Sequence, residues 1–527
     1  MKAQDYVISS EKFTFHSMGD KIHDTKLETR PMSYFKDALH RFAKNKASIA
    51  AAVIIGILIL FAIIGPMCTP YKVTDEDAKY RYVLPKNELF VKMGIHFWDG
   101  TTMKEVNKMT YDQYQAIEDE LGREVIIGDV TEKTIIEMKK EKTVYEFRLD
   151  TYEAVGAEFL LKNYDEYKAI QDYQDETGIL VILPVTDEKL RPEAKQDNEN
   201  PNIWYATTLG DGSKTSIVYD ENGKLIPIYK EYSNGGDDYT SKVRYEEGAP
   251  KYDYAIKKSG GMYQFRVDYK HYYTYLHTRV LKDGITKASF LFGATDAGKD
   301  IFTCLSSGAR FSFILAVIVA VVNLLVGAIY GAIEGYYGGK IDLLMERFVD
   351  ILGAVPTMIV ISLLKYNLGS NPNISLQPAE LNLLILFISF FATGWIGMAA
   401  RTRMQFYRFK NQEYVLVART LGARDRRIMF KHIFPNAIGT LITGSVLVIP
   451  GVIFSETSLT YLNIIDLNTG SMTSVGTLLA KGQANLFTYP HMILTPALFI
   501  SLLMLSFNLF GNGLRDAFNP SLRGTEE

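Results

Sequence analysis

Six long apolar stretches limit this chain to folds that cross a membrane. A bilayer core of ~30 Å needs about 20 residues of α-helix, and several of the stretches reach that length without interruption. The others are broken by Gly or Pro, which transmembrane helices tolerate where neighbouring helices satisfy the freed backbone groups. We therefore predict a mostly α-helical polytopic membrane protein. Its six transmembrane helices are expected at 47–66, 311–333, 348–364, 381–400, 437–455 and 491–511.

The placement of lysine and arginine predicts which side of the membrane each connection faces. Residues 1–46 carry nine Lys/Arg, and the loop 401–436 carries nine against two acidic residues. The connections 365–380 and 455–490 carry one Lys each. Cytoplasmic connections are enriched in Lys and Arg. Both termini, including the tail 513–527, are therefore predicted to be cytoplasmic, and the long segment between the first two spans is predicted to be extracellular.

That extracellular segment, 71–284, has the character of a soluble α+β domain. Residues 71–290 hold 31 Lys/Arg and 40 Asp/Glu, and they contain no apolar run long enough to cross a bilayer. Asn222 and Gly223 stand between two β-like runs, a pattern typical of a hairpin turn. The many tyrosines of the segment suit either a packed core or a contact surface, and the sequence leaves both readings open.

Two short strings recur in the extracellular segment. YDQYQAIED at 111–119 returns as YDEYKAIQD at 164–172, and each is followed by a β-like run. VYEFRLD at 144–150 returns as MYQFRVD at 262–268. A helix followed by a strand, found twice, predicts an α+β unit that is used more than once.

The stretch FLFGATDAGKD at 290–300 almost matches a phosphate-binding loop. Gly293, Gly298 and Lys299 fit the spacing G-x-x-x-x-G-K, but the next position should be a Ser or Thr that ligates Mg²⁺. Asp300 stands there instead, where a triphosphate would bring its own negative charge. The predicted topology also makes 290–310 an outer interfacial segment, away from cytoplasmic ATP. We therefore predict that it binds no nucleotide.

The cytoplasmic loop 401–436 contains a short helix with an apolar stripe. Asn411 is expected to cap this helix, Glu413 suits the positive end of its dipole, and Gly422 can end it in the left-handed conformation. The stripe follows from the spacing i, i+3, i+4 and i+7 and consists of Tyr414, Val417, Ala418 and Leu421. Two readings follow from the residues: a basic connector on the inner leaflet, or a helix that docks on a cytoplasmic partner.

The loop resembles the EAA coupling motif of ABC importer permeases, Glu-x-x-x-x-Ala-x-x-x-Gly followed by a proline. Glu413, Ala418, Gly422 and Pro435 stand at those positions, while Val417 replaces an alanine that is usual there. The wider string is similar to the C-type permease subunit of dipeptide and oligopeptide importers. Further similar strings enter the first span, join the second span to the third, and close the chain near 507–524. The resemblance does not extend to the extracellular segment.

This resemblance implies a type I ABC importer fold with six spans, a permease core at 311–512 and an inserted domain at 71–284. It implies a multi-pass protein of the bacterial cell membrane that is a non-catalytic transport subunit. The implied partners are a homologous second permease, two cytoplasmic ATPase subunits, an extracellular substrate-binding lipoprotein and a peptide substrate, with no nucleic acid. The chain itself would hold no cofactor or metal, since ATP and Mg²⁺ would bind the ATPase subunits. The residues expected to dock on those subunits are Glu413, Tyr414, Val417, Ala418, Arg419, Leu421, Gly422, Ala423 and Pro435.

Two alternatives stay open at this point. The same machinery could carry nickel or another small solute, or the chain could be a membrane sensor with a large ectodomain, although a sensor has no use for a coupling helix. Ionisable residues near the span ends are expected to be interfacial or interhelical partners: Glu334, Glu346, Asp350 and Glu456. Asn323 could bond a neighbouring helix or face the substrate path. Cys68 and Cys304 are expected to be two unpaired thiols in apolar surroundings.

Overall fold

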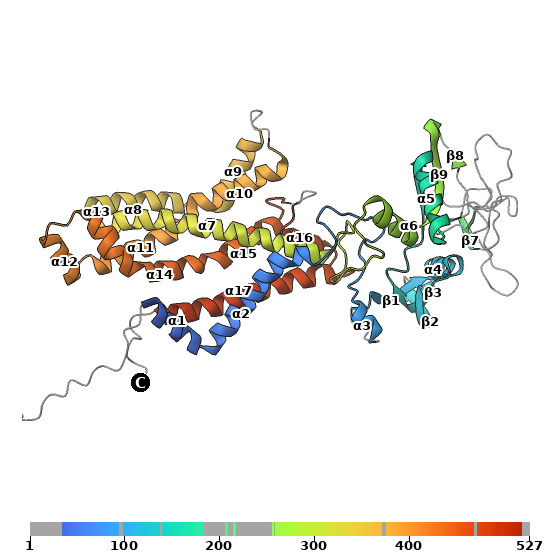
Figure 1. Cartoon of the computed structure of the whole chain (residues 1–527), viewed down its shortest axis with the longest axis horizontal. Helices are drawn as coiled ribbons and strands as arrows, with labels where there is room; N and C mark the ends of the chain where they lie inside the picture. The colour runs from blue at the N-terminus through green and yellow to red at the C-terminus, as the bar shows by residue number, and fades with distance from the viewer. Residues whose placement is uncertain are drawn as a thin grey trace, which may run out of the picture.

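The computed structural model describes residues 34–93, 98–137, 140–183, 206–208, 214–217, 256–257, 259–370, 376–467 and 472–518. Long helices form one part of the molecule, and a smaller part of strands and short helices stands at one end of its long axis (Figure 1). The short helix α12 (Glu413–Thr420) lies at the opposite end of that axis. Three predicted features lie wholly or partly outside the described residues. They are the N-terminal segment before residue 34, the tail after residue 518, and the hairpin at Asn222 and Gly223.

The long part is built from helices, in agreement with the predicted fold class. Among the described residues, five helices are long and apolar enough to cross a membrane: Lys46–Met67, Ile301–Tyr337, Pro378–Phe409, Asp425–Tyr461 and His491–Phe518. They contain, in order, α2 (Lys46–Ile64), α7 (Ile301–Tyr337), α10 (Pro378–Gly394) with α11 (Ile396–Phe409), α14 (Phe434–Val446) with α15 (Val448–Tyr461), and α17 (His491–Phe518). The short α13 (Asp425–Arg427) begins the fourth of these spans, and α1 (Tyr34–Lys44) and α16 (Val475–Ala484) lie outside them.

A sixth span results only if a bent pair of helices is counted as one. Helix α8 (Gly339–Gly353) meets α9 (Thr357–Gly369) at an angle of 71°. The bend follows from Pro356, because proline has no N–H to donate to the preceding turn and disfavours helical geometry at the residue before it. The straight span predicted at 348–364 therefore lies across the bend.

Helix α7 also differs from its prediction, because it runs without a break from Ile301 and includes residues 301–310 of the segment 290–310 that was expected to be separate. Asp300 begins this helix by accepting hydrogen bonds from the N–H groups of Phe302 and Thr303. The carboxylate that spoils the phosphate-loop pattern is therefore a helix cap.

Three glycines on one face of α7 allow α11 to approach closely. A Cβ added to Gly331 would lie 2.1 Å from the carbonyl oxygen of Ala399, and Gly327 and Gly335 are almost as tightly covered by α11. Small residues at four-residue spacing let the backbones of membrane helices touch. This contact fixes Arg403 of α11 beside the last turn of α7.

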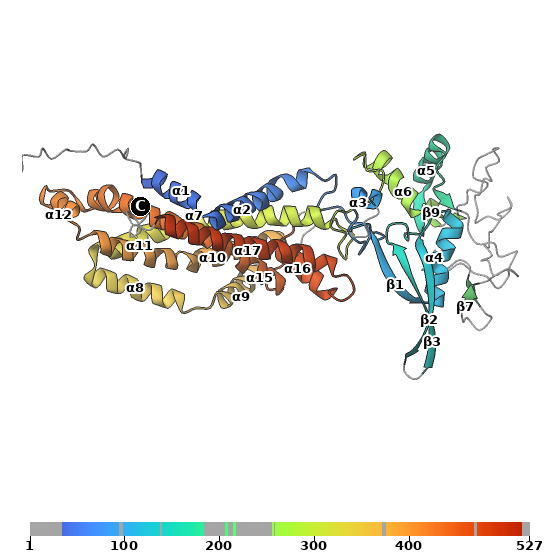
Figure 2. The same ribbon diagram turned by 90° about the horizontal axis from the view of Figure 1, so that it is seen from below.

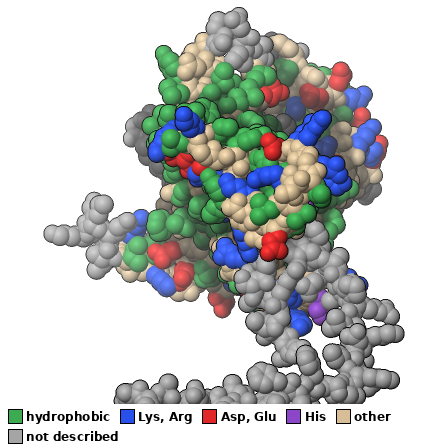
Figure 3. Space-filling model, turned by 90° about the vertical axis from the view of Figure 1, so that its left-hand side faces the viewer, with side chains coloured by type: hydrophobic (Ala, Val, Ile, Leu, Met, Phe, Trp, Pro, Cys, Tyr) green, Lys and Arg blue, Asp and Glu red, His purple; other side chains and the backbone are tan. Residues whose placement is uncertain are grey.

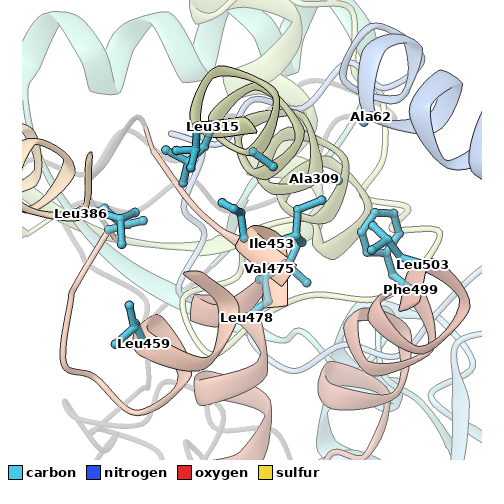
Figure 4. Packing of buried hydrophobic residues seen from close by; sticks show 14 of the residues in the cluster. Ala62, Ala309, Leu315, Leu386, Ile453, Leu459, Val475, Leu478, Phe499 and Leu503 are labelled. Carbon is cyan, nitrogen blue, oxygen red and sulfur yellow. The ribbon is translucent and has the colours of Figure 1, made fainter. Parts of the chain in front are cut away.

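A shared apolar core holds the membrane helices together towards the end that carries the strands. Leu315 of α7, Ile453 of α15, Val475 of α16 and Leu503 of α17 belong to one cluster of buried side chains (Figure 4). Glu456 is buried in the same region and accepts a hydrogen bond from Ser312 at 2.8 Å. It is thus an interhelical partner, as predicted.

The chain leaves α2 and re-enters α7 through two segments, 71–86 and 285–300, that lie side by side; we call this pair the joint. The N–H of Lys86 bonds the carbonyl of Phe290 at 3.0 Å, and the N–H of Ala294 bonds that of Val83 at 2.9 Å. A cluster of buried tyrosines and apolar side chains fills it. Cys68 and Cys304 are both free thiols, as expected, although Cys68 is exposed and only Cys304 is buried.

The inserted domain beyond the joint contains two similar β-α-β-β units. The first is β1 (Thr101–Asn107), α4 (Lys108–Leu121), β2 (Ile126–Glu137) and β3 (Lys140–Asp150), in a sheet of order β1-β3-β2. The second is β4 (Ala157–Asn163), α5 (Tyr164–Thr177), β5 (Ile182–Leu183) and β9 (Met262–Asp268), in the order β4-β9-β5 with β8 (Ile256–Lys257) added to β9. In both units the last strand is central and antiparallel to its neighbours. The remaining elements are α3 (Glu88–Lys92), the pair β6 (Ala206–Thr208) and β7 (Lys214–Ile217), and α6 (Tyr269–Tyr275).

The two units match in detail, but in a different register from the one the strings suggest. Asn107 caps α4 and Asn163 caps α5, and both helices end at a left-handed glycine, Gly122 or Gly178. These pairs are 56 positions apart, whereas the recurring strings are 53 apart. The two alignments therefore differ by three residues. Because a shift of three residues keeps a side chain on nearly the same helix face, the strings can match although the structurally equivalent positions are 56 apart. The other recurring pair, 144–150 and 262–268, matches in the structure as it does in the sequence, because the two strings lie on the equivalent central strands β3 and β9.

One side chain in each unit ties the helix to the strand that follows. Glu118 accepts hydrogen bonds from the N–H groups of Val125 and Ile126, both at 2.7 Å. Gln174 makes the same two bonds to Val181 and Ile182, both at 3.0 Å. We expect Glu118→Gln to be tolerated and Glu118→Ala to cost ~1–3 kcal/mol for each buried N–H left unpaired. Hydrogen–deuterium exchange of residues 122–130 in the purified chain checks this, and equal protection in Glu118→Ala and the wild type would contradict it.

Tyrosines build the cores of the inserted domain in the part of the chain that the structure describes. Tyr167 stacks on Tyr263 in the second unit, with ring centroids 5.7 Å apart, and Tyr111 stacks on Tyr145 in the first at 4.7 Å. Tyr80 is almost fully buried in the joint. Of the two readings of the tyrosine content, the packed core therefore holds for most of the described tyrosines.

A candidate docking helix at one end of the molecule

Helix α12 begins without a side-chain cap and is followed by a left-handed glycine. Its N-cap is Gln412, whose side chain makes no capping bond, so the predicted cap at Asn411 is wrong. The helix ends at Gly422, which has φ +80°. The N–H of Gly422 bonds the carbonyl of Arg419, and the N–H of Ala423 bonds that of Ala418, both at 3.0 Å. These two bonds form a Schellman motif, which requires a left-handed residue at Gly422.

One side of α12 packs on its own chain. Val415 is fully buried, and Ala418 is buried beside it. Val415 belongs to a cluster with Tyr336 of α7, Phe406 of α11 and Ile428. The prediction placed Ala418 in the middle of the apolar stripe that docks on a partner, whereas the structure buries it against its own chain. Val415, which the spacing argument missed, is the residue that anchors the helix.

The other side of α12 is apolar and exposed. Its large side chains are Tyr414, Leu416, Val417 and Leu421, and Val417 is 56% and Leu421 82% exposed. Glu413, Arg419 and Pro435 are also exposed, while Ala423 is partly buried. Figure 3 faces this end of the molecule and shows hydrophobic side chains beside Lys and Arg side chains. An eight-residue helix is too short to be stable alone, so its inner contacts present this face in a fixed orientation.

Polar contacts join α12 and the following turn to the last turn of α7. The hydroxyl of Tyr336 donates to Asp425 at 2.6 Å, and the guanidinium of Arg419 lies 5.9 Å from the centre of the Tyr336 ring. On the far side, the amide of Asn436 donates to the hydroxyl of Tyr414 at 3.2 Å. Any displacement of α12 therefore acts directly on the end of a long helix.

A cluster of charged side chains around Arg403 of α11 joins the end of α7 to α8. Arg403 lies 2.7 Å from Asp342 and 3.0 Å from Glu346, both on α8, and 3.4 Å from Glu334 on α7. Three helices are thus tied at one guanidinium, next to the cluster that holds α12. Glu334 and Glu346 are interhelical partners, as predicted, whereas Asp350 pairs within α8 with Arg347.

The stretch that resembles a phosphate loop is packed shut. A Cβ on Gly298 would lie 1.7 Å from the carbonyl oxygen of Asp77, so this glycine is required by the close approach of the joint. Lys299 is only 5% exposed, and its Nζ lies 3.1 Å from a carboxylate oxygen of Glu76. A phosphate-binding loop keeps its N–H groups and its lysine open for the ligand, and this loop uses them internally.

We expect Lys299→Ala to leave ATP binding by the complete transporter unchanged. The lysine pairs with Glu76 in the joint, so its loss should instead expose that region to protease. Nucleotide affinity of the assembled complex, measured beside limited proteolysis, checks both expectations. A large loss of ATP affinity would mean that the loop does hold phosphate.

Family models match the chain at both ends of its sequence. Residues 325–524 match the binding-protein-dependent transport system inner membrane component, and residues 33–85 match the N-terminal transmembrane domain of oligopeptide transport permease C. The oligopeptide transport system permease protein OppC of Bacillus subtilis is 40% identical over 252 residues, which are 48% of this chain and 78% of that protein. The chain belongs to this permease family.

Two further relatives have similar coverage. The dipeptide transport system permease protein DppC of Bacillus subtilis is 35% identical over 45% of this chain and 70% of its own length. The oligopeptide permease OppC of Haemophilus influenzae is 35% identical over 44% and 70%. The chain is therefore a multi-pass inner membrane permease and a transport subunit, as predicted, and not an enzyme. Residues 86–324 lie outside both family models.

Proposed function

We propose that this chain is the C-type permease subunit of an ATP-driven importer of oligopeptides or dipeptides. The observation that carries the proposal is the exposed apolar face of α12, held rigidly against the ends of α7 and α11. Such a face suits docking on a cytoplasmic ATPase subunit. Movement of that partner would then reach the spans through Val415 and Arg403. Two ATPase subunits, a homologous second permease and a substrate-binding lipoprotein complete the proposed machine, and ATP and Mg²⁺ bind to the ATPase subunits alone.

The proposed orientation places α12 and both termini in the cytoplasm and the inserted domain outside. The basic loop that contains α12 supports this orientation, and so does the position of α12 and the strands at opposite ends of the long axis (Figure 2). With this orientation the inserted domain stands at the outer mouth of the permease, where a binding protein delivers its cargo.

A cavity between the membrane helices is proposed as part of the substrate path. It has a volume of about 530 Å³ and is lined by α7, α9, α10 and α15. That is within the ~300–1,000 Å³ of typical ligand sites. Its walls are largely apolar, with Ser455 and Ser458 among the polar groups, and the buried side-chain oxygen of Asn323 has no hydrogen-bond partner there. Of the two roles open to Asn323, this arrangement favours facing the path.

Uptake into proteoliposomes tests the proposed cargo. The complete transporter with its binding protein should import a labelled tripeptide when ATP is supplied on the ATPase side, and should not import nickel. The peptide names of the relatives support the first outcome, and no observation favours nickel. Nickel uptake without peptide uptake would overturn the proposal.

We infer that the inserted domain contributes to the docking surface for the binding protein. Phe487, in the connection between α16 and α17, is 99% exposed, and its neighbour Tyr489 contacts the joint. An exposed aromatic side chain beside an extra domain is typical of a contact surface. The predicted contact through exposed tyrosines has less support, because most of the described ones are buried.

Deleting residues 101–268 with a short Gly/Ser bridge tests this role and leaves both segments of the joint in place. We expect the half-saturating concentration of binding protein for import to rise about tenfold, the loss of ~1.4 kcal/mol of docking free energy. ATPase subunits should still assemble, because α12 is at the other end. An unchanged half-saturating concentration would mean that the domain has no part in docking.

A further inference from the structure

A cavity of about 260 Å³ lies where the inserted domain meets the permease. It is lined by 79–84 of the joint, by β1, α4 and Leu149 of β3 in the first unit, by the stretch 151–157 between the two units, and by Thr488 with Tyr489 before α17. The cavity therefore belongs to the domain and to the membrane part together. Neither the docking helix nor the substrate path described above uses it.

The charged side chains that line this cavity are all positive. They are Lys79, Arg81 and Lys104, and the lining includes no Asp or Glu. Lys79 forms an ion pair with Glu158 just outside the lining. Within the described residues, Arg81 and Lys104 have no carboxylate partner. Residues 71–290 carry an excess of acidic residues, so two unpaired cations in one cavity of this domain mark a local site for an anion.

Three tyrosines and three threonines complete the polar wall: Tyr82, Tyr114, Tyr489, Thr102, Thr151 and Thr488. The rings of Tyr82 and Tyr489 stack with centroids 4.2 Å apart and planes 10° from parallel. Tyr82 has φ +61°, an uncommon conformation for a residue other than glycine. In this conformation the ring of Tyr82 contacts Tyr489 of the permease part. Nζ of Lys104 lies 5.8 Å from the centre of the Tyr489 ring. The phenol of Tyr114, which also lines the cavity, can donate a hydrogen bond.

The size and charge of the cavity restrict what it can hold. Pockets that enclose whole drug-sized ligands have volumes of ~300–1,000 Å³, so this cavity suits one end of an extended molecule. A free peptide has an ammonium at one end and a carboxylate at the other. The ammonium would meet two unpaired cations, whereas the carboxylate would be attracted to them, and the tyrosine rings would cover an adjacent apolar side chain.

We propose that this cavity binds the C-terminal end of an oligopeptide, with Arg81 and Lys104 holding its carboxylate and Tyr114 donating a hydrogen bond. The proposal rests on the peptide cargo proposed above. It gives the importer a peptide contact of its own at the outer mouth, separate from the binding protein.

Equilibrium binding to the complete complex in lipid nanodiscs, without binding protein, tests the site. The probes are a tritiated hexapeptide with a free C-terminal carboxylate and the same peptide amidated at that end. We expect the amide to bind at least about tenfold more weakly, because a charge-assisted contact is lost. The double variant Arg81→Gln, Lys104→Gln should weaken binding of the free acid by a similar factor and remove the difference between the two peptides. Lys104→Arg should restore part of the affinity, and Lys168→Gln, an exposed change on α5, should have no effect.

The outcomes separate this site from the general function. If the wild-type complex imports peptide but binds acid and amide equally, or binds neither without the binding protein, the site is wrong and the function stands. If the double variant instead weakens docking of the binding protein with either peptide, the cavity accepts an acidic group of that protein and the proposal is also wrong. If the wild-type complex imports no peptide at all, the function itself falls.

Discussion

Replacing Gly422 with valine is expected to reduce ATP-driven import at least about tenfold while the complex still assembles. At φ +80° a side-chain-bearing residue costs ~1–2 kcal/mol, and a β-branched one costs more. A Cβ at this position would touch nothing within 4 Å, so the effect comes from the backbone and not from a clash. Without the left-handed residue the Schellman bonds open, and α12 can no longer turn back at its end.

Asparagine is the matched control for this position, because it tolerates the left-handed conformation better than other residues. Gly422→Asn should retain most of the import measured in proteoliposomes, and both variants should elute as complete complexes in size-exclusion chromatography. Normal import by Gly422→Val would remove the coupling role assigned to this loop.

Aspartate at Val417 is expected to impair attachment of the ATPase subunits, whereas aspartate at Val415 is expected to impair folding. The two positions are on the same short helix. Val417 is exposed, so Val417→Asp should leave the permease folded but prevent the ATPase subunits from co-purifying with it. Val415 is fully buried, and an unpaired charge there costs several kcal/mol. Val415→Asp should therefore lower the amount of folded permease in the membrane.

Affinity purification and membrane content, measured for both variants, check this pair. If α12 were only a basic connector on the inner leaflet, Val417→Asp would leave the ATPase subunits attached. That result would contradict the docking role, whatever happens to Val415→Asp.

The sequence predicts the elements of this molecule better than their junctions. The apolar stretches identify the membrane helices because hydropathy is a property of the residues themselves. The break at Pro356 is visible in the sequence, but its 71° angle depends on how α8 and α9 pack. The joint could not be predicted, because it pairs 71–86 with 285–300, which are remote in the chain.

The docking helix shows the same limit on a smaller scale. Residues 414–418 are an unbroken apolar or small run, so either side of the helix could have faced the chain. Periodicity favours the stripe through Tyr414 and Leu421, whereas the structure buries Val415, because the cluster around Tyr336 and Ile428 accepts its side chain. Only the tertiary neighbours decide which face is left for a partner.

The two β-α-β-β units imply an order of events as the chain folds. In the first unit only residues 138–139 separate β2 from the central strand β3, whereas residues 184–261 separate β5 from β9 in the second. Each doubling of a closed loop costs about 0.6 kcal/mol, and about five doublings separate the two cases, or ~3 kcal/mol of closure entropy. The first unit can therefore form while the ribosome is still making the second. Until β9 emerges, α5 and β4 have no central strand, and that interval is when the domain is most open to misassembly.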